Sequence, residues 1–198
     1  MPYLLLAATW LFFGFTHSLT ASTRFKAWAT KQMGSFSAHN RLIYNGLSVL
    51  TLLPAVLVYT AAPTDYIGQW QGSVWLGVLL IGAGVLLVGI ALSGYNLREF
   101  VGVTGGTSQE NQPKKFRQGG LLRYVRHPLY VGIIVALGGL FVYAPIWATL
   151  LFNMLAISYI RTGIYFEERK LVAEYGAAYR DYQKRVPMLI PAIASRPA

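Results

Sequence analysis

The sequence predicts an all-α polytopic membrane protein with about five transmembrane helices, three single spans plus a helical hairpin, and a cytoplasmic C-terminal amphipathic helix. Hydrophobic residues make up 55% of the 198 residues and charged residues only 12%, about half the charged share of a soluble domain. The apolar residues gather into runs of about 20, the length that crosses the hydrocarbon of a bilayer as a helix. Basic residues separate these runs in an alternating pattern.

The apolar runs set the predicted elements, all within one integral membrane domain of residues 1–198. Spans are expected at about 2–19, 43–62, 74–95, 128–143 and 146–165, and the cytoplasmic helix at about 166–186. The first run lacks the basic start of a signal peptide and is taken as a retained helix. Pro54 predicts a kink. The long last run is broken by Gly138-Gly139 and Pro145, which predicts a tight hairpin.

The third span contains four glycines, namely Gly77, Gly82, Gly84 and Gly89. They resemble a nucleotide fingerprint only superficially, because no strand precedes them and they lie at membrane depth. Close packing of helices is the interpretation that fits small residues within an apolar span.

The distribution of bases predicts the orientation. Residues 22–41 hold four bases and no acid, residues 60–73 hold Asp65 and no base, and residues 96–127 hold six bases against two acids. Seven more bases follow Tyr159. Under the positive-inside rule the N-terminus lies outside and the C-terminus in the cytoplasm. The expected membrane is the cell inner membrane.

The formal charge of +10 does not indicate a nucleic-acid-binding protein, because the basic residues lie between apolar runs as juxtamembrane charges do. The absence of cysteine excludes disulfides, thiolate metal sites and a cysteine nucleophile. No metal site is expected. The predicted partners are membrane lipid and a small or lipophilic substrate.

The first candidate site is the run Arg126-His127-Pro128-Leu129-Tyr130-Val131-Gly132 at the start of the fourth span. Pro128 suits the first turn of a helix, and the free N–H groups there favour a carboxylate or phosphate. Gly132 allows another element to approach closely. The alternative is a plain helix start with basic side chains that reach the membrane surface.

The second candidate site is Arg161 with Glu167 and Glu168, where the last span leaves the membrane. Adjacent carboxylates at this depth need partners, so an ion-paired helix exit is one interpretation. The other is a pocket in which a carboxylate binds hydroxyls or a cation. The aromatic rings of Tyr130, Tyr165 and Phe166 would attract a sulfonium. Beyond them, a largely aromatic stripe at helical spacing predicts that the C-terminal helix packs on a membrane surface or on the rest of the protein. The stripe comprises Leu171, Tyr175, Tyr179, Tyr182 and Val186.

The third candidate is His17-Ser18 at the end of the first span. A single histidine there is more often a hydrogen-bonded interfacial residue than a ligand, and both interpretations stay open. His39 receives no role.

These motifs resemble the isoprenylcysteine carboxyl methyltransferase superfamily. The resemblance covers about the C-terminal third of the chain and rests on Leu122–Gly132, Phe166–Leu171, Tyr175-Gly176, Tyr179, Tyr182 and Arg185-Val186-Pro187. The N-terminal part is similar to the branch of bacterial methanethiol S-methyltransferases and NnrU-like membrane proteins, through His17-Ser18, Ala21, Phe25-Lys26 and Trp28. The ending Val186–Pro191 fits that branch as well.

The resemblance implies an S-adenosylmethionine-dependent methyltransferase with a five-helix core. The resemblance implies cofactor contacts by His127, Tyr130, Gly132, Glu167 and Glu168. Pro128, as the start of the helix, and Tyr165, as an aromatic face for a sulfonium, complete the expected cofactor-binding set. The resemblance also implies that Arg161 positions the substrate. Together with Arg161, Glu167 and His17 are the expected catalytic residues.

The acceptor is left open between a small or lipophilic thiol and a prenylcysteine-type carboxylate. A carboxylate is already ionised, whereas a thiol with a pKa of about 8.5 benefits from a base such as His17 or His127. The alternative function is a haem-binding protein, because NnrU-like relatives include a haem-dependent carotenoid isomerase and His17 and His127 can be imagined as paired ligands. A non-enzymatic scaffold is the third possibility.

Overall fold

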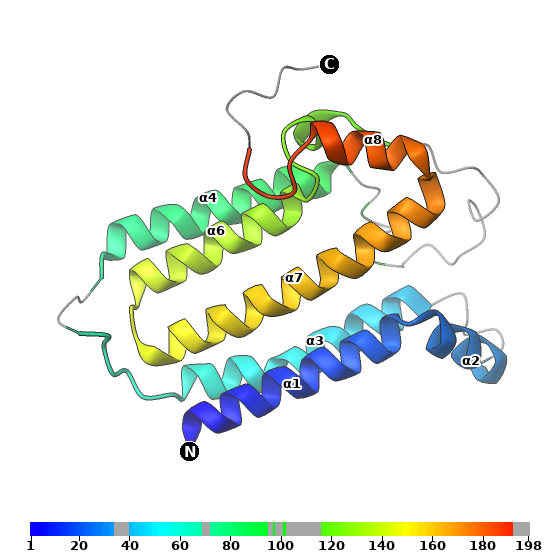
Figure 1. Ribbon diagram of the computed structural model, residues 1–198. Coiled ribbons are helices and arrows are strands. Elements are labelled where there is room, and N and C mark those ends of the chain that lie inside the picture. The colour runs from blue at the N-terminus through cyan, green and yellow to red at the C-terminus, as the bar shows by residue number, and fades with distance from the viewer. Residues whose placement is uncertain (34–39, 69–71, 95–96, 98–100, 102–115, 192–198) are drawn as a thin grey trace. The chain divides into compact units, whose positions relative to one another are not determined.

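Figure 1 shows the computed structural model, which describes residues 1–33, 40–68, 72–94, 97, 101 and 116–191. Within these residues the regular structure is helical, and an isolated bridge joins Tyr66 to Ile146. The elements are α1 (Pro2–Ala21), α2 (Thr23–Met33), α3 (Asn40–Thr60), α4 (Val74–Ser93), the 3-10 helix η2 (Gly120–Arg123), α6 (Pro128–Tyr143), α7 (Trp147–Tyr175) and α8 (Ala177–Arg185). The predicted all-α class is confirmed.

Three helices in the described part of the chain are long and apolar enough to cross a membrane, by length and composition: Pro2–Ala21, Leu42–Thr60 and Val74–Ser93. They correspond to the first three predicted spans, and they indicate an integral membrane protein. Helix α6 is apolar but has only 16 residues. The fourth and fifth spans stay predictions.

The chain divides into two compact units, and the single domain expected from the sequence stays a prediction. The first unit comprises Met1–Asp65 and Tyr95–Pro113, and the second comprises Tyr66–Gly94 and Lys114–Ala198. In the first unit α1 packs along α3 (Figure 1), with Leu6, Trp10 and Ala55 buried. Helix α3 continues through Pro54. Helix α2 was not predicted, because residues 22–41 were interpreted only as a basic connection.

In the second unit α4 and α6 pack in opposite directions through glycines that bring the two backbones together. A Cβ atom added to Gly84 would lie 2.5 Å from both the Ala136 nitrogen and the Gly132 oxygen. One added to Gly77 would lie 2.6 Å from the Tyr143 Cβ. A side chain at these positions would force the helices apart, which explains the glycines there.

The glycine prediction was right for only part of its set. A Cβ atom on Gly82 or Gly89 would meet nothing within 4 Å. These two glycines therefore do not contribute to close packing among the described residues. On α6, Gly139 does: its added Cβ would lie 2.6 Å from the Ile81 nitrogen. The prediction that Gly138-Gly139 breaks the helix is wrong, because both residues lie inside α6.

The hairpin turn falls at Ala144–Ile146, around the predicted breaker Pro145. Helix α7 then continues for 29 residues, through the boundary at 165–166 that separated a span from a cytoplasmic helix in the prediction. The reason is that an α-helix satisfies its own backbone hydrogen bonds in lipid and in water alike, so leaving the membrane does not require a helix end. The helix ends where Gly176 adopts φ +59°, a conformation that favours glycine.

Candidate functional site

An aromatic cluster fixes α8 against the end of α7. Tyr179, Tyr182 and Val186 are buried, and four partly buried residues pack on them: Phe116, Leu171, Val172 and Tyr175. The Phe116 ring lies edge-on to Tyr182, with ring centroids 5.1 Å apart. The Tyr182 hydroxyl donates to the Leu122 carbonyl at 2.7 Å. The predicted packing of the C-terminal stripe is confirmed, although the stripe is divided between two helices at Gly176.

The reversal at Gly176 brings the C-terminal residues back to the start of α6. The backbone N–H of Arg126 donates to the Pro187 carbonyl at 2.9 Å, and the N–H of His127 donates to the Met188 carbonyl at 3.2 Å. Residues 183–188, here called the strap, therefore run beside the turn that precedes α6. The Arg-His-Pro motif thus holds a chain segment as well as starting a helix.

Glu168 of α7 is the centre of the polar contacts between these segments. Its Oε1 accepts from Arg126 Nε at 2.6 Å and from His127 Nε2 at 3.1 Å. The Tyr179 hydroxyl approaches the same oxygen at 3.4 Å, and Gln183 Nε2 donates to Oε2 at 3.0 Å. The exposed side-chain fractions of Arg126 and Glu168 are 8% and 13%. The carboxylate is therefore well satisfied in a nearly dry place, where an unpaired charge would be costly.

The charge state of Glu168 follows from these partners. Burial alone would raise the pKa of the Glu168 carboxyl, but hydrogen bonds and charge from Arg126 and His127 outweigh burial and lower the pKa below its ordinary value. Burial, followed by the charge of Glu168, raises the pKa of the Tyr179 phenol. At neutral pH the site therefore holds an ionised carboxylate beside a neutral phenol.

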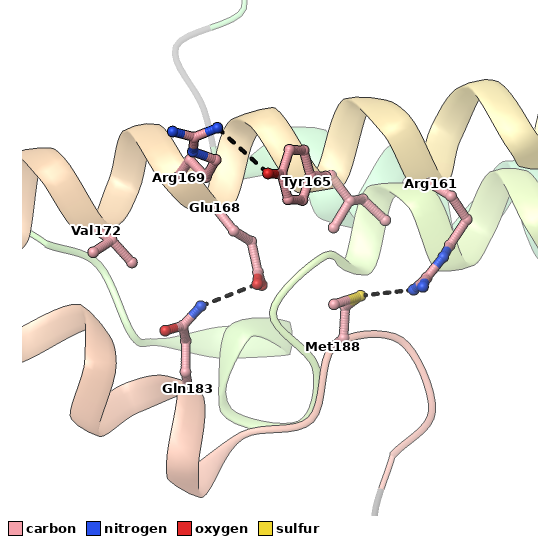
Figure 2. A pocket seen from close by; sticks show the side chains of 8 residues that line it. Arg161, Tyr165, Glu168, Arg169, Val172, Gln183 and Met188 are labelled. Atoms are coloured by element: carbon pink, nitrogen blue, oxygen red, sulfur yellow. Dashed lines mark hydrogen bonds between the residues drawn. The ribbon is translucent and has the colours of Figure 1, made fainter.

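A cavity of about 400 Å³ opens beside Glu168, between α7 and the strap (Figure 2). It is lined by Arg161, Ile164, Tyr165, Glu168, Arg169, Val172, Gln183 and Met188. Arg161 Nη1 lies 3.4 Å from the Met188 sulfur, and Arg169 Nη1 lies 3.4 Å from the Tyr165 hydroxyl. Within the described residues neither guanidinium forms an ion pair with a carboxylate. The cavity thus offers two cationic groups and one carboxylate.

The second candidate site of the sequence analysis largely coincides with this cavity, since Arg161, Tyr165 and Glu168 all line it. The ion-paired interpretation of the helix exit took Arg161, Arg169 and Lys170 as candidate partners for the carboxylates, but Glu168 pairs with Arg126 and His127. Glu167 is instead 46% exposed, with Oε2 3.7 Å from His127 Nδ1.

The first candidate site lies behind the cavity rather than in its wall. His127 reaches Glu168, and its ring centroid is 5.7 Å from that of Tyr130. Pro128 begins α6. Gly132 faces the backbone of α4, where an added Cβ would lie 2.8 Å from the Gly84 oxygen. The structure therefore gives Gly132 a packing role, and its predicted cofactor contact stays a prediction.

His17 belongs to the other unit, where both ring nitrogens are engaged. Nδ1 lies 2.8 Å from the Ser48 hydroxyl, and Nε2 pairs with the Tyr44 hydroxyl. Because the Ser48 hydroxyl donates its proton to the Tyr44 carbonyl at 2.7 Å, it accepts from Nδ1–H of His17. The Nε2 lone pair then accepts from Tyr44. An axial haem ligand needs a free imidazole nitrogen, which this arrangement does not present.

Sequence reasoning missed several residues of the site. Arg126 was considered only as a neighbour of the helix start, although two adjacent basic residues, Arg126 and His127, indicate a candidate partner for the carboxylates of the last long helix. Gln183 was not singled out, Arg169 was considered only as an ion-pair partner for the carboxylates, and Met188 appeared only within the ending Val186–Pro191. For Gln183 and Met188 the sequence holds no signal, because they reach the cavity only through the reversal at Gly176.

Comparison with known proteins places these features in a family. The model of the family described as "NnrU protein" matches residues 4–195. The chain belongs to the NnrU protein family. Among the relatives of this NnrU-family protein, methanethiol S-methyltransferase 2 of Bradyrhizobium diazoefficiens is 34% identical over 93% of the chain and 71% of its own length. Methanethiol S-methyltransferase of Pseudomonas sp. strain GM41(2012) is 30% identical over 90% of the chain and 69% of its own length.

A more distant relative belongs to the carboxyl-methylating branch. Protein-S-isoprenylcysteine O-methyltransferase of Schizosaccharomyces pombe is 32% identical over 60% of the chain and 48% of its own length. No solved structure matches the chain. The NnrU family and these relatives confirm the resemblance stated from the motifs. They also confirm the predicted class, a membrane methyltransferase, over the haem-binding alternative.

Proposed function

We propose that this protein transfers a methyl group from S-adenosylmethionine to a small or lipophilic thiol at the membrane, and that the cavity between α7 and the strap binds the methyl donor. The observation that carries the proposal is that one cavity brings together the ionised, largely buried Glu168 and two guanidinium groups, Arg161 and Arg169, which have no carboxylate partner among the described residues. The relatives named methanethiol S-methyltransferase support the thiol as acceptor.

The cavity fits the proposed donor in size and in chemistry. Its volume of about 400 Å³ falls within the range of roughly 300–1,000 Å³ that is usual for small-molecule sites. S-Adenosylmethionine carries a carboxylate, an ammonium group, ribose hydroxyls and a sulfonium. Glu168 accepts from an ammonium or hydroxyl, Arg169 pairs with a carboxylate, and the Tyr165 ring attracts a sulfonium. When bound, the donor supplies an electrophilic methyl group.

Arg161 is the residue that we assign to the acceptor. It stands at the end of the cavity marked by Met188, and Figure 2 shows it apart from the Glu168–Gln183 pair. A guanidinium there stabilises a thiolate over a thiol, because a neighbouring cation lowers a thiol pKa. It also fixes the direction of the nucleophile, and methyl transfer depends mainly on orientation and the exclusion of water.

The remaining assigned residues act around this pair. His127 and Tyr130 support the donor site from behind Glu168, at the start of α6 opened by Pro128. We keep Glu167 as a catalytic candidate, since it lies 3.7 Å from His127 Nδ1 and is open to solvent. We keep His17 as a catalytic candidate on the strength of the family resemblance; in the first unit its Nε2 is engaged by the Tyr44 hydroxyl, and that hydrogen bond would have to break before Nε2 could accept a proton.

The same proposal includes the topology. Helix α6 and the apolar first part of α7 form the fourth and fifth spans, the N-terminus lies outside, and the C-terminus lies in the cytoplasm, across the inner membrane of the cell. The alternation of basic segments supports this arrangement. A 16-residue helix measures about 24 Å, so α6 crosses with local thinning of the bilayer.

Arg161→Ala provides the test, with Arg180→Ala as a matched control because Arg180 is exposed on α8 and lines no part of the cavity. If Arg161 orients the acceptor, single-turnover methylation of methanethiol falls by about tenfold or more in Arg161→Ala, the loss that one charge-assisted contact produces. The affinity for S-adenosylmethionine, measured by calorimetry on the same preparation, stays near that of the wild type. Arg161→Lys recovers little, because an ammonium does not reproduce the planar fork.

Two results would contradict the assignment of Arg161. Normal turnover in Arg161→Ala removes it from the reaction. A parallel loss of cofactor affinity and protein stability, absent from Arg180→Ala, shows that Arg161 serves the fold or the donor instead of the acceptor.

A further inference from the structure

The Arg126 side chain makes three hydrogen bonds that no motif interpretation used. Its Nε donates to Glu168 Oε1 at 2.6 Å, and its Nη1 donates to the carbonyls of Val186 at 2.7 Å and Gln183 at 3.1 Å. The side chain is 8% exposed. Three acceptors from two different segments thus converge on one buried guanidinium, whose planar shape suits several acceptors at once.

Two of these acceptors are carbonyl groups at the C-terminal end of α8. Such carbonyls lack partners within their own helix, and a cation there also suits the negative end of the helix dipole. Arg126 therefore caps α8 from outside. The strap continues from this cap to Met188, whose side chain lines the cavity and meets Arg161.

We propose, on the basis of the proposed function, that Arg126 is a positioning residue that holds the Glu168 carboxylate and the strap together, so that Glu168 and Met188 face the bound methyl donor in a fixed arrangement. It does not itself line the cavity. Its effect on methyl transfer passes through Glu168, which it keeps ionised, and through the strap, which it keeps closed.

The charged and titratable groups around Glu168 make the first effect measurable. The turn before α6 contributes Arg126 and His127, α8 contributes Tyr179, and α7 contributes Glu167, Arg161 and Arg169. Among these, Arg126 is the nearest cation and donates the shortest hydrogen bond to the carboxylate, at 2.6 Å. Without it, both the hydrogen bond and the charge of Arg126 that lower the pKa of Glu168 are lost, so the pKa of this carboxyl rises relative to the wild type. Donor binding that needs ionised Glu168 would then be lost at a higher pH than in the wild type.

The second effect is measurable without any cofactor, because the chain has no cysteine. Met188→Cys places a single thiol on the strap, and its rate of alkylation by a maleimide reports how often the strap opens. The full-length protein in nanodiscs is used, in the Arg126→Ala, Arg126→Lys and Arg123→Ala backgrounds. Arg123 is the matched control, since it is an exposed arginine three positions earlier with no ion pair among the described residues.

In the same backgrounds without Met188→Cys, the affinity for S-adenosylmethionine and for S-adenosylhomocysteine is measured from about pH 5 to pH 8, a range that starts just above the ordinary carboxyl pKa. Arg126→Ala is expected to weaken binding about 10- to 100-fold at neutral pH and to shift the affinity midpoint upward in pH. It is also expected to speed alkylation. Arg126→Lys is expected to restore the pH profile but not the slow alkylation, because lysine supplies the charge without the fork. Arg123→Ala should match the wild type throughout.

The outcomes separate the two halves of the proposal from each other and from the proposed function. A uniform loss of affinity with an unmoved pH profile overturns the role of Arg126 in holding Glu168 ionised. Wild-type alkylation in Arg126→Ala, or slow alkylation restored by lysine, overturns its role on the strap. A wild-type protein that binds neither probe overturns the proposed donor site, and the alkylation rates then still decide whether Arg126 holds the strap.

Discussion

Gly84→Ala tests the packing between α4 and α6, and a second glycine on the same helix provides the control. The new Cβ would lie 2.5 Å from two backbone atoms, the Ala136 nitrogen and the Gly132 oxygen. Backbone atoms cannot rotate aside as a side chain does, so the two helices must separate. The matched control is Gly82→Ala on the same helix, where the new Cβ would meet nothing within 4 Å.

The magnitude follows from comparing the two variants. Each gains the helix propensity of alanine over glycine, about 1 kcal/mol, so this gain cancels in the difference. What remains is the cost of overpacking at Gly84, about 1–3 kcal/mol. Gly82→Ala is expected to be neutral or slightly stabilising, and Gly84→Ala to have a free energy of unfolding lower than that of Gly82→Ala by this amount.

The assay is reversible unfolding of the purified protein in mixed micelles, titrated with a denaturing detergent and followed by circular dichroism. Equal free energies of unfolding for the two variants, within about 0.5 kcal/mol, the usual scatter for surface substitutions, would refute the close approach of the two backbones. Gly89→Ala, whose Cβ also meets nothing within 4 Å, should repeat the behaviour of Gly82→Ala.

The same glycines show how far the sequence determines the fold. Gly77 and Gly84 are seven residues apart, and so are Gly82 and Gly89, so spacing alone does not reveal which pair faces a neighbour. The selection comes from α6, where Gly132 and Gly139 have the same spacing and meet the first pair. Helix periodicity predicts that small residues share a face, but the partner decides which face is used.

The site was predictable where one helix carries the chemistry and not where two segments meet. Arg161, Tyr165 and Glu168 lie on α7 at helical spacing, so their common face was readable from the sequence. Met188 and Gln183 come to the same cavity because Gly176 reverses the chain at φ +59°. A single glycine in a polar stretch does not specify the direction of the helix that follows, so their contribution had to come from the structure.

Three further predictions test separate parts of the account. Tyr182→Phe should lower the free energy of unfolding by about 0.5–1.5 kcal/mol, because it removes the 2.7 Å hydrogen bond to the part-buried Leu122 carbonyl. Tyr179→Phe loses only a 3.4 Å contact and should cost less in the same unfolding titration. Because the pKa of Glu168 is lowered in the folded protein, the stabilisation by its carboxylate is complete above the ordinary carboxyl pKa and is lost as the pH falls through the folded-state pKa. The difference in thermal midpoint between the wild type and Glu168→Gln should therefore be constant at neutral pH and shrink in acid. A difference that grew in acid would contradict the ion pair. A tag inserted at residue 109 should be reached only from the cytoplasm and one at residue 69 only from outside, and accessibility from the same side would refute the five-span topology.

One measurement on the purified protein in nanodiscs tests the identity of both the methyl donor and the methyl acceptor. S-Adenosylmethionine carrying an isotope-labelled methyl group is supplied with methanethiol in one reaction and with a prenylcysteine in another. The account predicts labelled methyl thioether from methanethiol, little labelled ester from the prenylcysteine, and loss of the thioether product in Arg161→Ala with the label still bound. Labelled, base-labile ester without thioether would contradict the thiol as acceptor, and a protein that neither binds nor consumes the labelled donor would contradict the central claim.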